Sequence, residues 1–384
     1  MGIASSKMIE ELIKLRKEIH QHPELSGQEI RTSKRIINFV EPHNPTKIID
    51  KIGGHGLAVV YEFGKEGPTV MIRCELDALP IEESNTFNHT SIHKGVSHKC
   101  GHDGHMAIVA GLAFWIKEQR FRSGTVILFF QPAEETGKGA LNVIEDPKFK
   151  RLKPDFIFAL HNLPGEPMHT VLAKQGCFSA LVQSTIITLT GKESHASEPK
   201  NGLNPTLALS EIIDALSTLN HYNAADEDFS ILTPVYITLG APSYGISPGK
   251  AEIHYTLRAW NPAKMKALEQ RIYDITRKSC KNHGLQLKVE WLEYFPETTN
   301  DAECYTRIKN AATANNLELK EAHSPLRFGE DFGWFSRHFK TAIFGLGAGV
   351  HTPSLHHADY DFPDELIETG ITMFKSIIAG ILKD

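Results

Sequence analysis

Three runs of this sequence are apolar at nearly every residue, and each leads directly into side chains that can bind a metal ion or a proton. They are residues 124–131, followed by Glu134 and Glu135; residues 155–160, followed by His161; and residues 341–347, whose next loop contains His356. A short, continuously apolar run indicates a strand buried on both faces, as in a mostly parallel sheet covered by helices. The chain is therefore predicted to have an α/β fold.

A fourth polar residue follows a further strand pattern. Residues 56–63 and 69–76 predict two strands around a hairpin, and the second strand ends at Asp77. The carboxyl ends of strands in an open α/β sheet lie at one edge, where binding sites form. We therefore expect Asp77, the Glu134-Glu135 pair, His161 and the His356 loop to converge.

The stretch 97–105 packs a thiol, three imidazoles and a carboxylate into nine residues. It precedes an apolar pattern of helical spacing, so Cys100 and His102 are placed at a helix start. A helix N-terminus lowers the pKa of a nearby cysteine, and the thiolate is the form that binds metal. Most histidines are ordinary surface or core residues, but Cys-x-His in a glycine-rich turn favours a metal site.

The mixture of donor types favours a catalytic metal site over a structural one. Structural zinc sites are closed by four ligands, mostly Cys and His. Glu134 and Glu135 are neighbours, and adjacent side chains in extended structure point apart. One carboxylate can then bind metal while the other handles a proton, as metal-assisted hydrolysis requires.

The middle of the chain differs from its two ends. With 384 residues, two domains are expected. Between about residues 180 and 293 the strands alternate apolar and polar residues, and two helical patterns cover 205–219 and 262–283. This indicates an α+β domain, 180–293, inserted into an α/β domain formed by 1–179 and 294–384.

The amino-acid composition limits the classes of molecule that the protein is expected to bind. The net charge is −5 and basic residues are scattered among acidic ones, which argues against nucleic acid and anionic membranes and favours small molecules. Five scattered cysteines argue against a disulfide framework. No apolar segment resembles a signal peptide or a membrane span, so a cytoplasmic location is expected.

Six motifs resemble, in order, those of the M20 metallopeptidase-like amidohydrolases. They lie at residues 100–105, 131–135, 160–162, 191–196, 329–332 and 355–356. The resemblance extends from about Leu12 to Leu382 and is greatest to the aminoacylase/hippurate hydrolase branch, which includes auxin-conjugate hydrolases and N-acetyldiaminopimelate deacetylases. It implies a two-metal hydrolase of N-acyl-L-amino acids, with a catalytic α/β domain and an inserted, ferredoxin-like lid and dimerisation domain.

The resemblance also implies roles for single residues. The implied metal ligands are Cys100, His102, Glu135, His161 and His356, with Glu134 as the general base. The two divalent ions would be zinc or manganese, with nickel or cobalt also compatible with these donors.

Three further roles follow from the same resemblance. His195 corresponds to a histidine that the partner subunit of a homodimer supplies to stabilise the oxyanion. Asp77 corresponds to an aspartate that supports a metal-site residue, and Arg258 to a residue that binds substrate.

Some positions depart from the family pattern. Glu75 replaces an aspartate, and Gly245 replaces a lid asparagine that reaches the substrate carboxylate in relatives. Four other histidines lie outside the matched motifs and are not expected to bind metal: His98, His105, His351 and His357. The alternatives are a dipeptidase or carboxypeptidase of the same architecture and an inactive metal-binding scaffold, which the presence of Glu134 disfavours.

Overall fold

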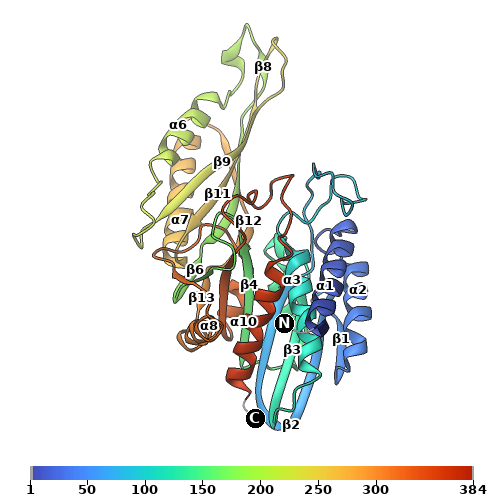
Figure 1. Ribbon diagram of the computed structural model, residues 1–384. Helices are drawn as coiled ribbons and strands as arrows, with labels where there is room; N and C mark the ends of the chain where they lie inside the picture. Colours follow the sequence, from blue (N-terminus) through green and yellow to red (C-terminus); the bar gives the residue numbers. More distant parts are fainter. Residues whose placement is uncertain (1–2, 383–384) are drawn as a thin grey trace. The chain divides into compact units, whose positions relative to one another are not determined.

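The computed structural model describes residues 3–382, with side chains from residue 6 to residue 382. The chain forms two compact units, which can be followed by colour in Figure 1. Unit 1 comprises Met1–Phe178, Thr298–His323 and Glu330–Asp384, and unit 2 comprises Ser179–Glu297 and Ser324–Gly329. The predicted inserted domain, 180–293, differs from the main segment of unit 2 by one residue at its start and four at its end.

The short segment Ser324–Gly329 also packs with unit 2, whereas the sequence placed it in the catalytic domain. Two hydrogen bonds explain this. The Ala180 N–H donates to the Leu326 carbonyl at 2.9 Å, and Arg258 Nε donates to the Arg327 carbonyl at 2.8 Å. Both partners are distant in sequence, so no local pattern indicated the contact.

Unit 1 contains a seven-stranded, mostly parallel sheet. Its order is β1-β2-β4-β15-β5-β14, with β3 paired to β2. The strands are β1 (Lys47–Ile52), β2 (Gly56–Glu75), β3 (Ser123–Gln131), β4 (Phe156–Leu163), β5 (Val171–Ala173), β14 (Leu319–Glu321) and β15 (Lys340–Gly347). β4 runs parallel to β2 and β15, while β1 and β5 add antiparallel pairs. The predicted α/β fold is confirmed.

The predicted hairpin is wrong. Both of its segments belong to β2, and they lie on opposite sides of β3, because Val59 and Ile72 both pair with Leu128. A turn between two strands does not reveal whether a third strand will lie between them. The arrangement puts Glu75 opposite Gln131, so the ends of β2 and β3 are neighbours.

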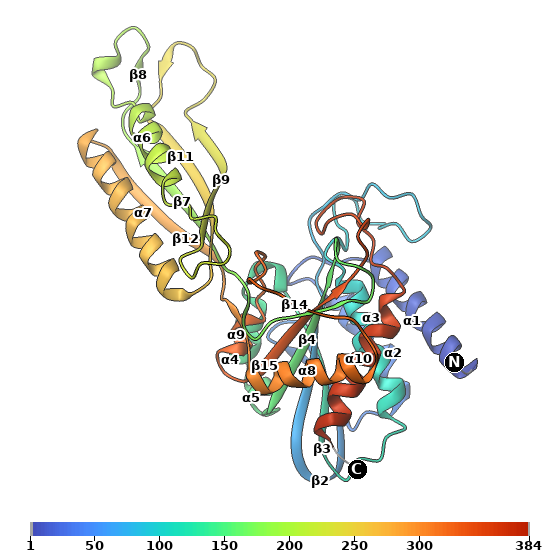
Figure 2. The ribbon, with the colours of Figure 1, turned by 60° about the vertical axis from the view of Figure 1, so that its left-hand side comes forward.

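Helices cover both faces of this sheet (Figure 2). One layer contains α1 (Ile3–Gln21), α2 (Ile30–Val40), α3 (His102–Ile116), α8 (Ala302–Ala314) and α10 (Leu366–Ile381). The opposite layer contains the short helices α4 (Gly139–Glu145), α5 (Pro147–Lys150) and α9 (Gly333–Ser336). Leu128 faces the first layer, whereas Phe129 packs edge-on against Phe149 at 5.5 Å between ring centroids. Burying one such side chain stabilises the fold by about 1.5–3 kcal/mol.

Unit 2 is an antiparallel sheet covered on one face by two helices. The sheet order is β12-β7-β11-β9. Its strands are β7 (Leu181–Thr190), β9 (Ser230–Leu239), β11 (Lys250–Ala259) and β12 (Gln286–Phe295), and its helices are α6 (Thr206–Ser217) and α7 (Pro262–Asn282). Alternate residues of β11, such as Ile253 and Leu257, are buried under the helices. The βαββαβ element order and this strand order are those of a ferredoxin-like unit.

Four short strands complete the two units. β6 (Gly176–Ser179) pairs with β13 (Thr298–Asn300) where the chain leaves unit 1 and returns to it. β8 (Ser194–His195) pairs with β10 (Ile246–Ser247) within unit 2.

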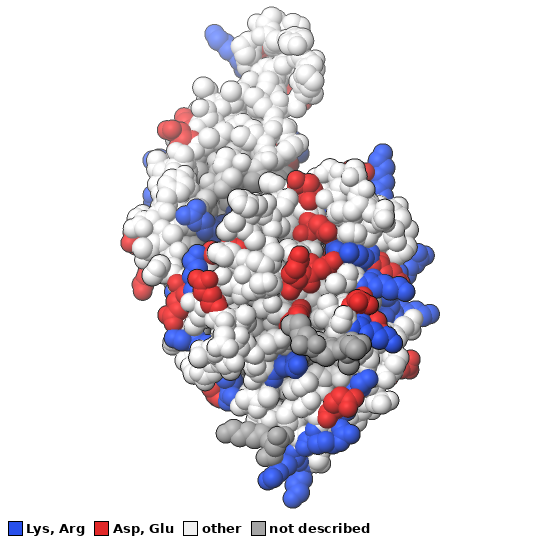
Figure 3. Space-filling model, in the orientation of Figure 1, with Lys and Arg blue, Asp and Glu red and all other residues white. Residues whose placement is uncertain are grey.

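The face of unit 1 drawn in Figure 3 carries both signs of charge. Lysine and arginine side chains alternate there with aspartate and glutamate. No helix within residues 3–382 combines the length and the apolar character needed to cross a membrane.

Candidate metal centre

The carboxyl-end edge of the unit 1 sheet gathers the predicted ligands. Glu135 follows β3 in a short 3-10 helix, Glu134–Thr136, and His161 lies near the end of β4. Cys100 and His102 occupy the loop and first residue that open α3, and His356 lies in the loop between β15 and α10. Segments up to 256 residues apart in the chain therefore meet at one edge, because the parallel strands all end there.

The donor atoms of these residues are close enough to share metal ions. Cys100 Sγ lies 3.5 Å from His161 Nε2, and Glu135 Oε1 lies 3.9 Å from His102 Nε2 and 3.8 Å from His356 Nε2. Several overlapping sets of predicted ligands and Glu134 have all their donor atoms within 4.8 Å of one another: Cys100, His102 and His161; Cys100, Glu135 and His356; and His102, Glu134 and Glu135.

Two unsatisfied atoms indicate that these residues fit a cation. His102 Nε2 and Glu135 Oε1 are buried without a hydrogen-bond partner, an arrangement that costs free energy in a folded protein. His102 Nδ1 donates to the Asp77 carbonyl at 2.9 Å, and His161 Nδ1 donates to the Asn162 carbonyl at 2.9 Å. These bonds fix both tautomers so that Nε2 presents a lone pair, as in metal-binding histidines.

The expected effect of the helix start on Cys100 is wrong. Burial raises the pKa of the Cys100 thiol well above its usual value, and the nearby Glu135 and Glu134 carboxylates raise it further. A helix terminus contributes only partial charge, which desolvation and two carboxylates outweigh. Thiolate formation would therefore depend on a bound cation.

The Glu134-Glu135 pair also differs from the extended geometry that the sequence suggested. Ala133, before the pair, has φ 55°, and the two glutamates lie in a 3-10 helix. The two carboxylates do not point apart as expected, because one oxygen of each lies within 4.8 Å of the other and of a His102 ring nitrogen. Glu134 Oε1 accepts the Asp331 N–H at 3.3 Å, and its Oε2 lies 4.0 Å from His102 Nε2, while Glu135 is directed to His356.

Burial dominates the acidity of both glutamates. It raises the pKa of Glu134 well above that of an ordinary carboxyl, and the nearby Glu330 and Glu135 carboxylates raise it further. Burial raises the pKa of Glu135 to about 7, although His102 opposes the shift. A carboxyl group with a raised pKa beside a cation site is suited to accepting and returning a proton.

Asp77 is hydrogen-bonded to the segments that carry Glu135 and His102. Its Oδ2 accepts the Glu135 N–H at 3.0 Å and the Ser26 hydroxyl at 2.7 Å, and its carbonyl accepts His102 Nδ1. One buried aspartate thus orients two predicted ligands, which agrees with a supporting position.

His105 and Glu75 form a pair that the motif pattern did not indicate. His105 Nδ1 bonds to Glu75 Oε2 at 2.7 Å, and its Nε2 bonds to Asn162 Oδ1 at 2.6 Å. Both ring nitrogens therefore have protein partners and are not available to a metal. Glu75 also pairs with the buried Arg73. The only sequence signal was the unusual glutamate near the end of an apolar strand.

The two remaining predicted site residues belong to unit 2. His195 is exposed on β8, and its Nδ1 accepts the Ser197 N–H at 3.1 Å, which leaves the proton on Nε2. Arg258 is half-buried on β11. Burial lowers the pKa of the Arg258 guanidinium.

Sequence comparison identifies the family. The chain matches the profile described as Peptidase family M20/M25/M40 over residues 71–380. The chain belongs to this family. The resemblance seen in the six motifs is therefore confirmed for M20, and the match includes every segment that contributes to the candidate metal centre.

Curated M20 relatives align along nearly the whole chain. An N-acetyl-L-cysteine deacetylase of Bacillus subtilis is 32% identical over 94% of this chain and 86% of its own length. An N-acetyldiaminopimelate deacetylase of the same organism is 31% identical over 97% of this chain and 100% of its own. A hippurate hydrolase of Campylobacter jejuni is 28% identical over 97% of each chain.

Solved structures of similar proteins share the fold. The Bacillus subtilis YXEP protein, described as a dinuclear metal-binding peptidase of the M20 family, is 26% identical with a TM-score of 0.83. The match covers 98% of this chain and 99% of that one. A putative aminohydrolase of Staphylococcus aureus is 26% identical with a TM-score of 0.86, covering 98% of each chain.

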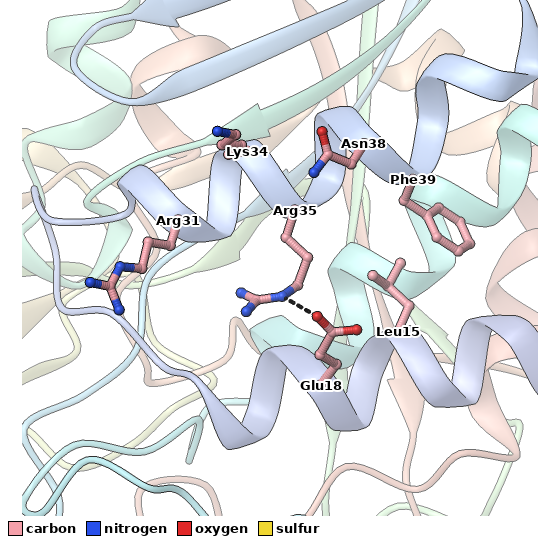
Figure 4. Close-up of a pocket in the computed structure, with 7 residues that line it drawn as sticks. All are labelled: Leu15, Glu18, Arg31, Lys34, Arg35, Asn38 and Phe39. Carbon is pink, nitrogen blue, oxygen red and sulfur yellow. Dashed lines mark hydrogen bonds and ion pairs between the residues drawn. The ribbon is translucent and has the colours of Figure 1, made fainter.

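A separate hollow of about 510 Å³ lies on unit 1 between α1 and α2 (Figure 4). Its lining residues are Leu15, Glu18, Arg31, Lys34, Arg35, Asn38 and Phe39. Arg35 reaches across it to Glu18, with Nε and Oε1 2.8 Å apart. None of these residues belongs to the candidate metal centre.

Proposed function

We propose that this M20 protein is a metal-dependent amidohydrolase that cleaves the amide bond of N-acyl-L-amino acids, releasing a carboxylate and a free amino acid. The observation that carries the proposal is the cluster of thiol, imidazole and carboxylate donors at one sheet edge, with Glu134 beside it. The relatives named above, two deacetylases of N-acetylated amino acids and a hippurate hydrolase, support this substrate class.

The proposed ligands of two divalent ions are Cys100, His102, Glu135, His161 and His356. Their mixed donor types suit zinc or manganese, and nickel or cobalt are also compatible. Bound there, two such ions would lower the pKa of water and polarise the amide carbonyl. The dinuclear description of the YXEP protein supports the number of ions.

Glu134 is the proposed general base. Its Oε1 is held by the Asp331 N–H, and its Oε2 faces the donor cluster through His102. In this position its carboxylate would take a proton from the attacking water and return it to the leaving amine. Asp77 would keep Glu135 and His102 oriented through its carboxylate and carbonyl.

We further propose that unit 2 is a lid and dimerisation domain. Its edge strand β9 exposes three consecutive apolar side chains, Val235, Tyr236 and Ile237, each about half accessible. Figure 3 shows few charged side chains on the face of unit 2 that it draws. An exposed apolar edge strand favours pairing with a second copy of the chain.

In such a homodimer, His195 of one subunit would act in the site of the other. The hydrogen bond from Ser197 leaves His195 Nε2–H as a donor, which is the form that can stabilise an oxyanion. Arg258 would bind the substrate carboxylate. A cytoplasmic location is also proposed, supported by the absence of a disulfide among the described residues.

A substrate screen tests the function. Protein purified without added metal should contain up to two divalent ions per chain by elemental analysis. It should hydrolyse some members of a panel of acetyl, benzoyl and indolyl-acetyl amino acids, and unblocked dipeptides more slowly. Faster cleavage of unblocked dipeptides would favour a dipeptidase instead, and a metal-loaded protein inactive on both panels would favour a scaffold.

A further inference from the structure

The loop that carries His356 has no regular structure of its own. Residues 348–365, between β15 and α10, contain no helix or strand. His356 itself has φ 66°, in the left-handed region that non-glycine residues seldom adopt, and its side chain is 51% exposed. Such a backbone persists only where the surroundings hold it. The position of His356 must therefore be set by contacts from elsewhere in the chain.

Asn162 donates to the Tyr360 hydroxyl and Arg16 pairs with Asp361, but most of the backbone contacts of the 356–360 stretch come from the segment that precedes Cys100. The His356 N–H donates to the Lys99 carbonyl at 2.7 Å. The Ser84 N–H donates to the Ala358 carbonyl at 3.0 Å, and Asn85 Nδ2 donates to the Asp359 carbonyl at 2.9 Å. The loop is thus bound along its backbone by residues more than 250 positions earlier in the sequence.

Lys99 contributes the most unusual of these contacts. Its side chain is fully buried, which is rare for lysine because a desolvated ammonium must be matched by acceptors. Three acceptors surround Nζ: the Glu83 carboxylate, Asn85 Oδ1 at 2.9 Å and the Tyr360 carbonyl at 2.8 Å. They match the three N–H donors of the ammonium.

Lys99 therefore binds the loop at both ends of its 356–360 stretch. Its carbonyl accepts from His356, its ammonium donates to Tyr360, and a single peptide bond joins it to Cys100. The donor atoms of Cys100, Glu135 and His356 lie within 4.8 Å of one another. Lys99 is the residue that links Cys100 and His356 through backbone and side chain together.

We propose that the buried Lys99 is a positioning residue for metal binding, which holds the His356 loop against Cys100 so that both side chains reach one ion. This inference rests on the proposed ligand set. It assigns Lys99 a role through His356, and no contact with substrate.

The test is metal binding by the stripped protein, measured by calorimetric titration with Mn²⁺. The Lys99→Met variant keeps the length of the side chain and removes its charge, while Glu83 keeps its bonds to His20 and the Ser91 N–H. We expect the affinity for one of the two ions to fall by about 10–100-fold, with the other nearly unchanged. Lys94→Met, at an exposed lysine of the same segment, is the matched control and should bind both ions normally.

Two further variants separate positioning from general stability. Asn85→Ala removes the bond to the Asp359 carbonyl and one of the three acceptors of the Lys99 ammonium, while the other two acceptors remain. It should weaken binding of the same ion by a smaller factor than Lys99→Met does. In a His356→Ala background, Lys99→Met should cause no further loss, because the two changes act through one ligand. A folded Lys99→Met protein with normal affinities, equal weakening of both ions, or additive losses in the double variant would each overturn the proposal.

The same titration separates this inference from the proposed function. If the wild-type chain binds no Mn²⁺, or if His356→Ala binds as the wild type does, the ligand set itself is wrong and the Lys99 inference is overturned with it. If the wild type and His356→Ala behave as expected but Lys99→Met binds both ions as the wild type does, the ligand set stands and Lys99 contributes only to stability.

Discussion

The carboxylate of Glu29 accepts the Ala133 N–H at 2.8 Å, across 104 residues of sequence. Glu29 is fully buried, and the same oxygen accepts the Gly27 N–H at 2.8 Å. Ala133 has the left-handed backbone, φ 55°, that turns the chain from β3 into the Glu134-Glu135 pair. The first turn of the candidate site is thus held by a residue at the start of α2.

Replacing Glu29 should destabilise this turn. Glu29→Ala leaves two backbone N–H groups without a partner, which costs about 1–3 kcal/mol for each that stays buried. Glu29→Gln keeps an acceptor oxygen and should cost less. Urea denaturation measures the difference, with Glu118→Ala, at an exposed acidic residue, as the control. Equal stabilities for Glu29→Ala and the wild type would contradict the importance of this bond.

Glu134 and Glu135 should respond differently to the same substitution. Glu134→Gln should keep its metal and lose activity by about 10²–10⁴-fold, because it removes the proposed base. Glu135→Gln should lose metal, because Glu135 Oε1 lies between His102 and His356. Metal analysis and initial rates on the preferred substrate distinguish the two. Wild-type turnover by Glu134→Gln would show that the roles are wrongly assigned.

Removing the metal should lower stability. The unsatisfied His102 Nε2 and Glu135 Oε1 are expected to gain partners only when ions bind. Ions at 100 times their Kd stabilise a protein by about 2.7 kcal/mol for each site. The free energy of unfolding measured with Mn²⁺ should exceed that measured with chelator by an amount of this size. The difference should be smaller for Cys100→Ser. An identical unfolding curve in both conditions would argue against a metal centre.

His20 should make stability depend on pH. Burial by itself lowers the pKa of His20, but hydrogen bonds to Asp103 and Glu83 outweigh burial and raise it to about 9. The interactions that raise this pKa stabilise the folded protein fully at pH values below the pKa of histidine in the unfolded chain, about 6.5. This stabilisation is lost as the pH rises through 9. His89, His98 and Asp361 also lie near the ring. Arg16 and Lys99 bind the same carboxylate oxygens of Asp103 and Glu83 that His20 binds.

The measurement compares unfolding free energies of the wild type and His20→Gln between pH 6 and 9.5. Their difference should shrink as the pH rises, by up to about 3 kcal/mol for a shift of this size. His93→Gln, at an exposed histidine, should follow the wild type. A difference independent of pH would mean that His20 is neutral in the folded protein.

Subunit mixing tests the role of His195. Alone, His195→Ala should reduce turnover by about 10²–10³-fold, as removal of an oxyanion donor does. Mixed with Glu134→Ala after subunit exchange, about half of the dimers should contain one of each chain and one complete site, which restores roughly a quarter of wild-type activity. Two inactive variants that stay inactive after verified exchange would exclude action across subunits.

Much of the fold could be predicted because its signals are local. Apolar runs such as residues 124–131 and 155–160 identified buried strands, and alternation in residues 252–260 identified a sheet covered on one face. The pattern of apolar residues within a strand shows which of its faces are buried, so it can be recognised from the residues of that strand alone. The hairpin failed because pairing on both sides of β3 depends on a third segment.

For the candidate site, the sequence by itself determined which donor types stand at the ends of the strands and that Cys100 and His102 lie together at a helix start. Only the tertiary structure decided how those groups are held. The bonds from Glu29 to Ala133 and from Lys99 to His356 join segments more than 100 residues apart, and desolvation by the surrounding chain reverses the expected pKa shift of Cys100. Each depends on which distant atoms fill the space around a group, and that is set by packing, not by neighbours in the chain.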